Sequence, residues 1–183
     1  THDLDPPTKQ RLQLSSPAIL SLGFLALIVI GTVLLSLPIA TIQPISILAA
    51  AFTATSAVTV TGLNVVDTAN YTTFGQLVIA ALIQFGGLGF MTFAILVLTS
   101  LQGKMGLSGS ITAQEALGTH SNQIGSTAKA VIKIAFITEG LGFLGLTLLL
   151  APLKGLKDAM YEAFFLCISA FNNAGFALNG NNM

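Results

Sequence analysis

The run PISILAAAFTATSAVTVTGL, residues 44–63, carries no charge and lies between two longer apolar segments, 17–37 and 74–101. Its helix-like part ends near Val58 and is about 15 residues long, too short to cross the roughly 30 Å hydrocarbon layer of a membrane. Residues 59–63 are rich in β-branched side chains and include Gly62, which predicts extended backbone. Irregular backbone at membrane depth is tolerated only where it lines a watery cavity or is buried in protein. The run therefore predicts a short helix that dips into a membrane, followed by a strand-like return.

Composition also predicts a lipid environment. Of 183 residues, 53% are hydrophobic and 8% are charged, with a mean hydropathy of +0.83, whereas soluble proteins carry about 25% charged residues. Segments 17–37, 74–101 and about 127–150 are each apolar enough to span, and we expect Pro38 and Pro152 to end the first and third. The net charge of zero gives no basic surface for nucleic acid. The single cysteine, Cys167, lies in an apolar run and is predicted to be buried.

The same plan occurs a second time after the third span. Residues 159–171 form a second short helix candidate, and 172–176 follow it as a second irregular segment. A shift of 113 positions gives four identities in thirteen positions, and these superpose Phe52 on Phe165, Ser56 on Ser169, Ala57 on Ala170 and Gly62 on Gly175. We infer an internal repeat of span, short pore helix, glycine-bearing strand and span.

The repeat divides the chain into four parts. They are an amino-terminal segment (1–16), a first repeat (17–102), a polar linker (103–126) and a second repeat (127–183) that lacks its closing span. The same offset would put that closing span near position 187, so we expect residues 1–183 alone not to form a working pore.

Orientation follows from the basic residues in the short connections. Five lie before the first span or between the second and third, and two lie on the other side. Because basic loops stay in the cytoplasm, the amino terminus and the 103–126 linker are predicted to be cytoplasmic. Both short helices then enter the membrane from outside.

Such a unit suits a cation. A short inward helix presents its carboxyl end, about half a negative charge, near the membrane centre. The following segment can offer carbonyl oxygens in place of the hydration shell of an ion, and glycine permits the backbone angles that turn them inward. Neither segment contains Asp or Glu, which favours a monovalent ion such as K⁺.

The runs TSAVTVTGL (55–63), IQFGGLGFMTF (83–93) and SAFNNAGF (169–176) together resemble the Trk/Ktr/HKT superfamily of potassium transporters, and the last run is most similar to the Ktr branch. The resemblance implies an all-α membrane protein whose span–pore-helix–filter-strand–span units surround one pore with four-fold pseudosymmetry when complete. It also implies K⁺ uptake across the cytoplasmic membrane, with Na⁺ as a second candidate ion and no organic cofactor in this chain. The implied partners are a second copy of the chain and a cytosolic nucleotide-binding regulatory ring. The implied filter residues, acting through backbone carbonyls, are Val60, Thr61, Gly62 and Leu63 with Asn173, Ala174, Gly175 and Phe176.

Two acids are candidate functional residues. Glu139 lies within the third span, where acids are often functional, although a bond to a neighbouring helix explains it equally well. Asp67 follows the first predicted strand and could concentrate cations at the mouth of a pore, but a role in the turn 67–70 is the simpler interpretation. The cluster Gly86–Gly89 lies in an uncharged span and predicts close helix packing.

Two other classes of protein share single features with this sequence. A secondary transporter for a small organic solute also uses broken helices, but solute recognition would usually add charged or aromatic contacts that both strands lack. An intramembrane serine protease is suggested by the pattern Gly106–Gly109, but Ser108 lies in a polar segment and no histidine accompanies it at membrane depth. We therefore predict a transporter rather than an enzyme.

Overall fold

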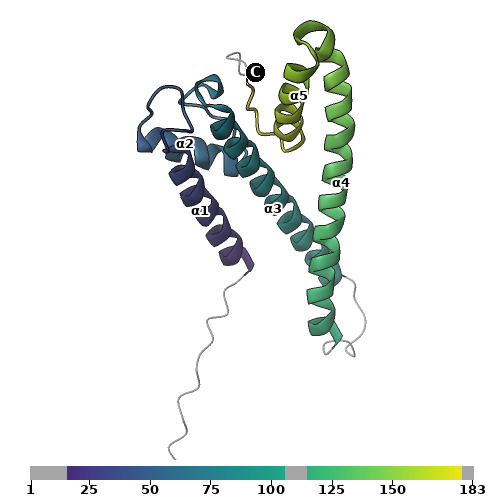
Figure 1. The fold of residues 1–183 in the computed structure, drawn as a ribbon. Coiled ribbons are helices and arrows are strands. Elements are labelled where there is room, and N and C mark those ends of the chain that lie inside the picture. The colour runs from purple at the N-terminus through teal and green to yellow at the C-terminus, as the bar shows by residue number, and fades with distance from the viewer. Residues whose placement is uncertain (1–15, 106–114, 179–183) are drawn as a thin grey trace, which may run out of the picture.

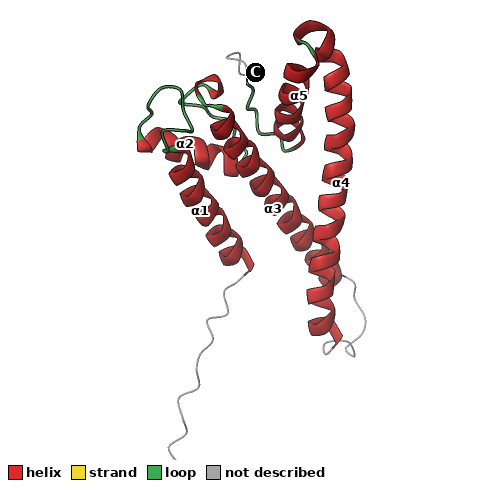
Figure 2. Ribbon diagram, viewed as in Figure 1, coloured by secondary structure: helices red, strands yellow, loops and turns green. Residues whose placement is uncertain are grey.

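The computed structural model describes residues 16–105 and 115–178, which form five α-helices, one 3₁₀ helix and no β-strand (Figures 1 and 2). The elements are α1 (Ser16–Leu35), α2 (Ile47–Val58), η1 (Thr68–Asn70), α3 (Thr73–Met105), α4 (Glu115–Lys154) and α5 (Leu156–Phe171). The predicted all-α class is confirmed. The protease-like pattern 106–109 and the segment 1–15 lie outside the described residues.

Two helices are long and apolar enough to cross a membrane, over Thr73–Ile95 in α3 and Ala128–Lys154 in α4. Helix α1 carries no charge and has 20 residues, which at about 1.5 Å per residue reaches about 30 Å. In Figure 1 these three helices are the long rods of the molecule, whereas α2 and α5 are short. The two short helices correspond to the two segments that the sequence predicted to be too short to span.

Helix α2 starts where its sequence provides a cap. The Ser46 hydroxyl oxygen accepts a hydrogen bond from the Ala49 amide at 3.1 Å, which satisfies one of the amide groups left free in a first helical turn. Three consecutive alanines follow, and alanine has the highest helix propensity. Helix α5 begins at Leu156, three residues before its predicted start, and Asp158 provides a favourable negative charge in its first turn.

Two sequence expectations are wrong in detail. Pro152 does not end the third span, because α4 continues to Lys154 and a proline in the last turn costs little of the helical hydrogen bonding. Helix α3 ends at Met105 and α4 begins at Glu115, so the 103–126 linker has helical residues at both of its ends. The segment after Val58 is not a strand, because its backbone turns sharply at Val60 and Gly62, where φ is +53° and +73°.

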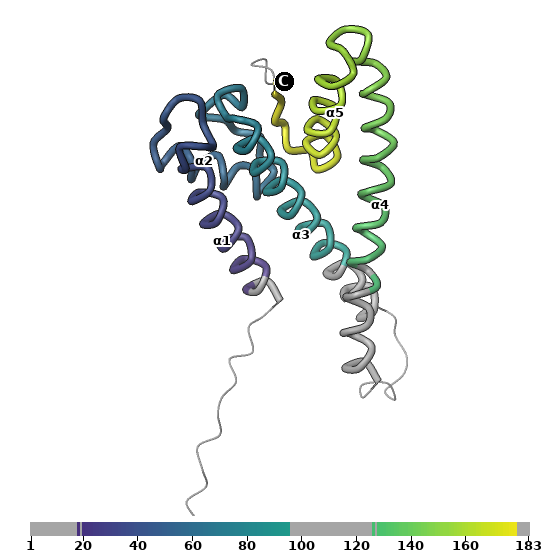
Figure 3. Tube along the Cα trace, in the orientation of Figure 1, coloured from purple at the N-terminus to yellow at the C-terminus, as the bar shows by residue number. Residues whose placement is uncertain are grey.

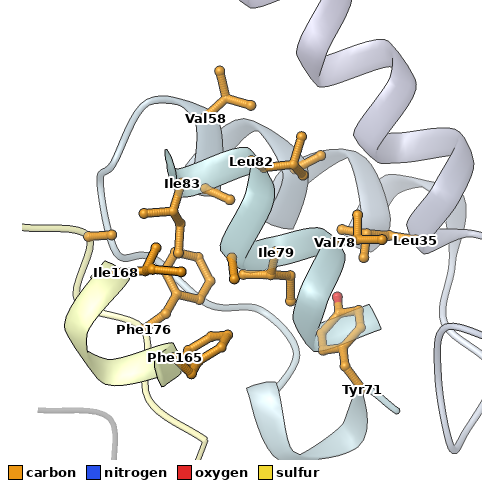
Figure 4. Packing of buried hydrophobic residues seen from close by; sticks show 14 of the residues in the cluster. Leu35, Val58, Tyr71, Val78, Ile79, Leu82, Ile83, Phe165, Ile168 and Phe176 are labelled. Carbon is orange, nitrogen blue, oxygen red and sulfur yellow. The ribbon is translucent and has the colours of Figure 1, made fainter. Parts of the chain in front are cut away.

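The core joins the two predicted repeats. Ile79 and Ile83 of α3 are fully buried, and they belong to one cluster with Phe165 and Phe176 from α5 and the segment after it (Figure 4). Figure 3 shows the path that brings them together, with α5 folding back beside the end of α4 toward α3. Helix α3 is therefore the surface on which both short helices are positioned.

Glycines in α3 allow the closest approaches. A Cβ atom at Gly86 would overlap the carbonyl oxygen of Val58, the last residue of α2, and one at Gly87 would overlap the side-chain oxygen of Asn172. At Gly89 the nearest atom is a ring carbon of Phe24, at 3.5 Å. The predicted packing role of this glycine cluster is confirmed, because the absence of side chains lets the ends of both short helices rest on α3.

Candidate ion-binding site

The first loop, residues 59–63, begins with a tight turn at the carboxyl end of α2. The amides of Thr59, Val60 and Thr61 donate to the last carbonyls of the helix, at 2.9 Å to Thr55, 3.3 Å to Ala57 and 3.0 Å to Ser56. Val60 then adopts a φ of +53°, which is rare for a β-branched residue. Strained backbone of this kind persists where the surrounding structure enforces it, and it concentrates at functional sites.

The second loop, residues 172–176, has the same conformation 113 positions later. Asn172 follows α5 with φ −82° and ψ −1°, where Thr59 follows α2 with φ −87° and ψ 1°. Asn173 has a φ of +58° and Gly175 a φ of +71°, matching Val60 and Gly62. The two loops thus share one backbone path although only the glycine is identical in this part of the repeat.

A buried serine fixes each loop. The Ser56 hydroxyl oxygen accepts a hydrogen bond from the Leu63 amide at 2.9 Å, and Ser169 accepts one from the Phe176 amide at 2.9 Å. Both serines are 3% exposed. Their identity was visible in the 113-residue repeat, but their role was not, because a serine in an apolar helix is equally consistent with helix packing.

The two loops meet at their glycines. A Cβ atom at Gly62 would lie 2.7 Å from the carbonyl oxygen of Ala174, and one at Gly175 would lie 3.4 Å from the Cα atom of Gly62. The structure therefore brings the two predicted filter segments side by side. Among the predicted residues, Ala174 and Phe176 are buried, with the Phe176 ring in the core, whereas Thr61, Leu63 and Asn173 are exposed.

A cavity of about 540 Å³ lies at the carboxyl ends of both short helices. Helices α1, α2 and α3 and both loops contribute its lining, which consists of Phe24, Val58, Thr59, Val60, Phe90, Met91, Asn172 and Asn173. The helix ends that border it each carry partial negative charge. The described part of the cavity lining contains no charged side chain, so the helix dipoles and backbone carbonyls are its electrostatic features.

A model of the family described as "TrkH: Cation transport protein" matches residues 11–183. The chain belongs to the TrkH family of cation transport proteins. With its two membrane-length helices, this TrkH-family chain is a membrane protein, and the sequence resemblance to the Trk/Ktr/HKT superfamily is confirmed.

Curated relatives of the TrkH-family chain carry transport names. It is 46% identical over 175 residues to the Ktr system potassium uptake protein B of Bacillus subtilis, covering 94% of this chain and 39% of that protein. It is 40% identical to the protein of the same name from Vibrio alginolyticus, covering 91% and 37%. It is 35% identical to the potassium/sodium uptake protein NtpJ of Enterococcus hirae, covering 94% and 39%. The chain thus spans about two fifths of the length of the curated relatives it matches.

The candidate acids of the TrkH-family chain lie apart from the paired loops. The Asp67 carboxylate accepts a hydrogen bond from the Ala69 amide at 3.1 Å and begins η1, which is the predicted turn role. Glu139 accepts a hydrogen bond from the Gln84 side chain at 2.8 Å, so it does bond to a neighbouring helix. Cys167 is buried, as predicted.

Helix α2 of the TrkH-family chain is also held from its outer side. The Tyr71 hydroxyl donates to the Thr53 hydroxyl at 3.0 Å, and both residues are buried. Burial raises the pKa of Tyr71 above its ordinary value, so the phenol stays protonated and keeps donating. Sequence reasoning missed this bond, because Tyr71 lies in no recognisable motif. It also missed the role of Asn172, because the run 169–176 predicted backbone carbonyls at an ion site and not a side-chain hydrogen bond to α3.

Proposed function

We propose that the chain belongs to a transporter that takes up K⁺, with Na⁺ as a second ion, through a pore lined by backbone carbonyls of residues 60–63 and 173–176. The single observation that carries this proposal is the pair of loops with matching backbone, in contact at Gly62 and Ala174. Both follow the carboxyl end of a short helix that borders one cavity. The names of the relatives, which are potassium and potassium/sodium uptake proteins, agree with this ion choice.

The backbone of each loop suits ion coordination. In a regular strand, neighbouring carbonyls point to opposite sides, and a positive φ at every second residue turns them toward one side. Val60 and Gly62 have this alternation, and so do Asn173 and Gly175. Carbonyls on one side of two adjacent loops can replace part of the water shell of K⁺, and the number and geometry of those oxygens set its preference over Na⁺.

The proposal also covers the complete pore, the orientation of the chain in the membrane and its partner subunits. Two loops cover only part of an ion, so further units, with four-fold pseudosymmetry, complete the pore. The protein lies in the cytoplasmic membrane with its amino terminus inside, as the basic residues favour. The name "Ktr system" of two relatives supports assembly with other subunits, which we propose to be a second copy and a cytosolic nucleotide-binding ring.

Uptake by the full-length protein tests the function. Expressed in bacteria that lack their own K⁺ uptake, together with its regulatory partner, the protein should restore growth at low K⁺ and should accumulate Rb⁺ in competition with K⁺. Organic solutes in excess should not compete, which separates an ion pore from a solute transporter. Protein in the membrane with no K⁺ uptake above the empty-vector control would contradict the proposal.

A further inference from the structure

Three polar side chains form a chain of hydrogen bonds between α4, α3 and the second loop. The Asn172 amide group donates to the Gln84 carbonyl oxygen at 3.0 Å, and the Gln84 amide group donates to the Glu139 carboxylate at 2.8 Å. The direction of donation is the same at both steps. Gln84 therefore uses both ends of its side chain, and its orientation is set by an acceptor on one side and a donor on the other.

The hydrogen bonds of Gln84 and Glu139 lie in mainly apolar surroundings. Gln84 and Glu139 line a cavity of about 430 Å³ whose other walls are apolar and aromatic, including Phe85, Phe136 and Phe164. Glu139 is the one acid in the membrane-length segment 128–154. An acid in such a segment is costly, and hydrogen bonds away from water are stronger than those in contact with it. A polar chain at this depth thus provides a strong fixed link between elements that otherwise pack through apolar contacts.

Hydrogen bonds hold the amide nitrogen of the Asn172 side chain, while its Oδ1 atom is buried with no hydrogen-bond partner in the described part of the chain. The Asn172 side chain also donates to the Ile168 carbonyl at 2.9 Å, the backbone amide donates to the same carbonyl at 3.2 Å, and the residue is 5% exposed. It rests directly against Gly87 of α3. The next residue, Asn173, is the first with positive φ, so the position of Asn172 determines where the second loop begins.

We propose that Glu139 and Gln84 are positioning residues that set the K⁺/Na⁺ preference of the pore by holding Asn172 at the start of the second loop. This inference rests on the proposed function. The ion does not need to touch either side chain. A small shift of Asn172 would move Ala174, whose carbonyl oxygen faces Gly62 of the first loop, and carbonyl geometry governs the preference.

The role depends on hydrogen bonding and not on the charge of Glu139. A glutamine at position 139 also has an oxygen that can accept from Gln84, so Glu139→Gln should keep a preference near that of the wild type. Glu139→Leu and Gln84→Leu remove the link. Glu139→Leu removes one hydrogen bond and Gln84→Leu removes two. Glu139→Leu should lower the K⁺/Na⁺ preference about fivefold, on the scale of one hydrogen bond, and Gln84→Leu at least as much, chiefly through the KM for K⁺. The double variant should be no worse than Gln84→Leu, since both substitutions break one chain.

The experiment measures the KM and maximal rate for K⁺ and Na⁺ uptake by the full-length protein in K⁺-uptake-deficient bacteria. Tyr161→Phe is the matched control, because the Tyr161 hydroxyl also links α5 to α3 by a side-chain hydrogen bond, 2.7 Å to Gln76, but in the first half of α5 and away from Asn172. Its preference should stay that of the wild type. Gly87→Ala, whose Cβ atom would overlap the Asn172 side-chain oxygen, should reproduce the loss without altering Gln84 or Glu139.

The outcomes separate this inference from the proposed function. A wild-type protein that takes up no K⁺ would overturn both. K⁺ uptake with an unchanged preference in Gln84→Leu and Glu139→Leu would overturn the positioning role alone, as would a Glu139→Gln variant as impaired as Glu139→Leu. If the leucine variants do not reach the membrane, Gln84→Asn replaces them. Its amide is one methylene too short to reach both partners, and an unchanged preference there would overturn the inference equally.

Discussion

Replacing Gly62 with alanine perturbs the contact between the loops at a single point. The residue has a φ of +73°, where an L-residue with a β-carbon is strained by about 1–2 kcal/mol. The new Cβ atom would also lie 2.7 Å from the Ala174 carbonyl oxygen. Carbon–oxygen contacts are normally about 3.3 Å or longer, so that carbonyl or the first loop must move by about 0.6 Å.

Such a displacement is large for an ion site. We expect Gly62→Ala in the full-length protein to lower the K⁺/Na⁺ preference about tenfold, because about 1.4 kcal/mol of lost coordination energy corresponds to that ratio. Competition between K⁺ and Na⁺ for Rb⁺ uptake measures the preference, and the amount of protein in isolated membranes shows whether insertion is intact.

Gly175→Ala and Gly23→Ala separate the steric effect from the backbone effect. Gly175 has nearly the same φ, +71°, but a Cβ atom there meets only the Gly62 Cα, at 3.4 Å. Its preference should therefore fall less than that of Gly62→Ala. Gly23 lies in α1 with nothing within 4 Å of an added Cβ, and its substitution should leave the preference unchanged. A wild-type preference in Gly62→Ala, or an equal loss in all three variants, would refute the reasoning.

Two further predictions concern topology and stability. In a background where Cys167 is serine, a cysteine at Asn70 should react with an impermeant thiol reagent added outside, and one at Ser121 should not; the reverse pattern would invert the orientation. Tyr71→Phe should destabilise the protein by about 1–3 kcal/mol, because it leaves the buried Thr53 hydroxyl without this donor. The thermal midpoint of the purified full-length protein measures this, and an unchanged midpoint would show that the bond contributes nothing to stability.

Much of the architecture was readable from the sequence. Charge-free segments of membrane length predicted α1 and α3, and an apolar segment interrupted by Lys133 and Glu139 predicted more than half of α4. Segments too short to span predicted α2 and α5. The 113-residue offset located both loops, because it aligned Gly62 with Gly175, whose φ values are +73° and +71°. These features depend on local hydropathy and on glycine, which a single sequence displays directly.

The finer geometry was not readable, for physical reasons. Val60 is β-branched and its neighbours favour extended backbone, yet the contacts around the loop hold it at a φ of +53°. Asn172 corresponds to Thr59 in the repeat. Because these two residues differ, the alignment of the repeats did not single out position 172. Its partner Gln84 is 88 positions away, and Glu139 is 55 positions from Gln84. Hydrogen bonds across such separations follow from the packing of α3 against α4 and α5, which no local pattern displays.

The most direct test of the carbonyl-lined pore is the anomalous diffraction of Rb⁺, a close substitute for K⁺, in crystals of the full-length protein. The account predicts an anomalous peak in direct contact with backbone carbonyl oxygens of residues 60–63 and 173–176, and its loss when Rb⁺ is exchanged for excess K⁺. An ordered Rb⁺ held elsewhere by side chains, with no peak between the two loops, would contradict it.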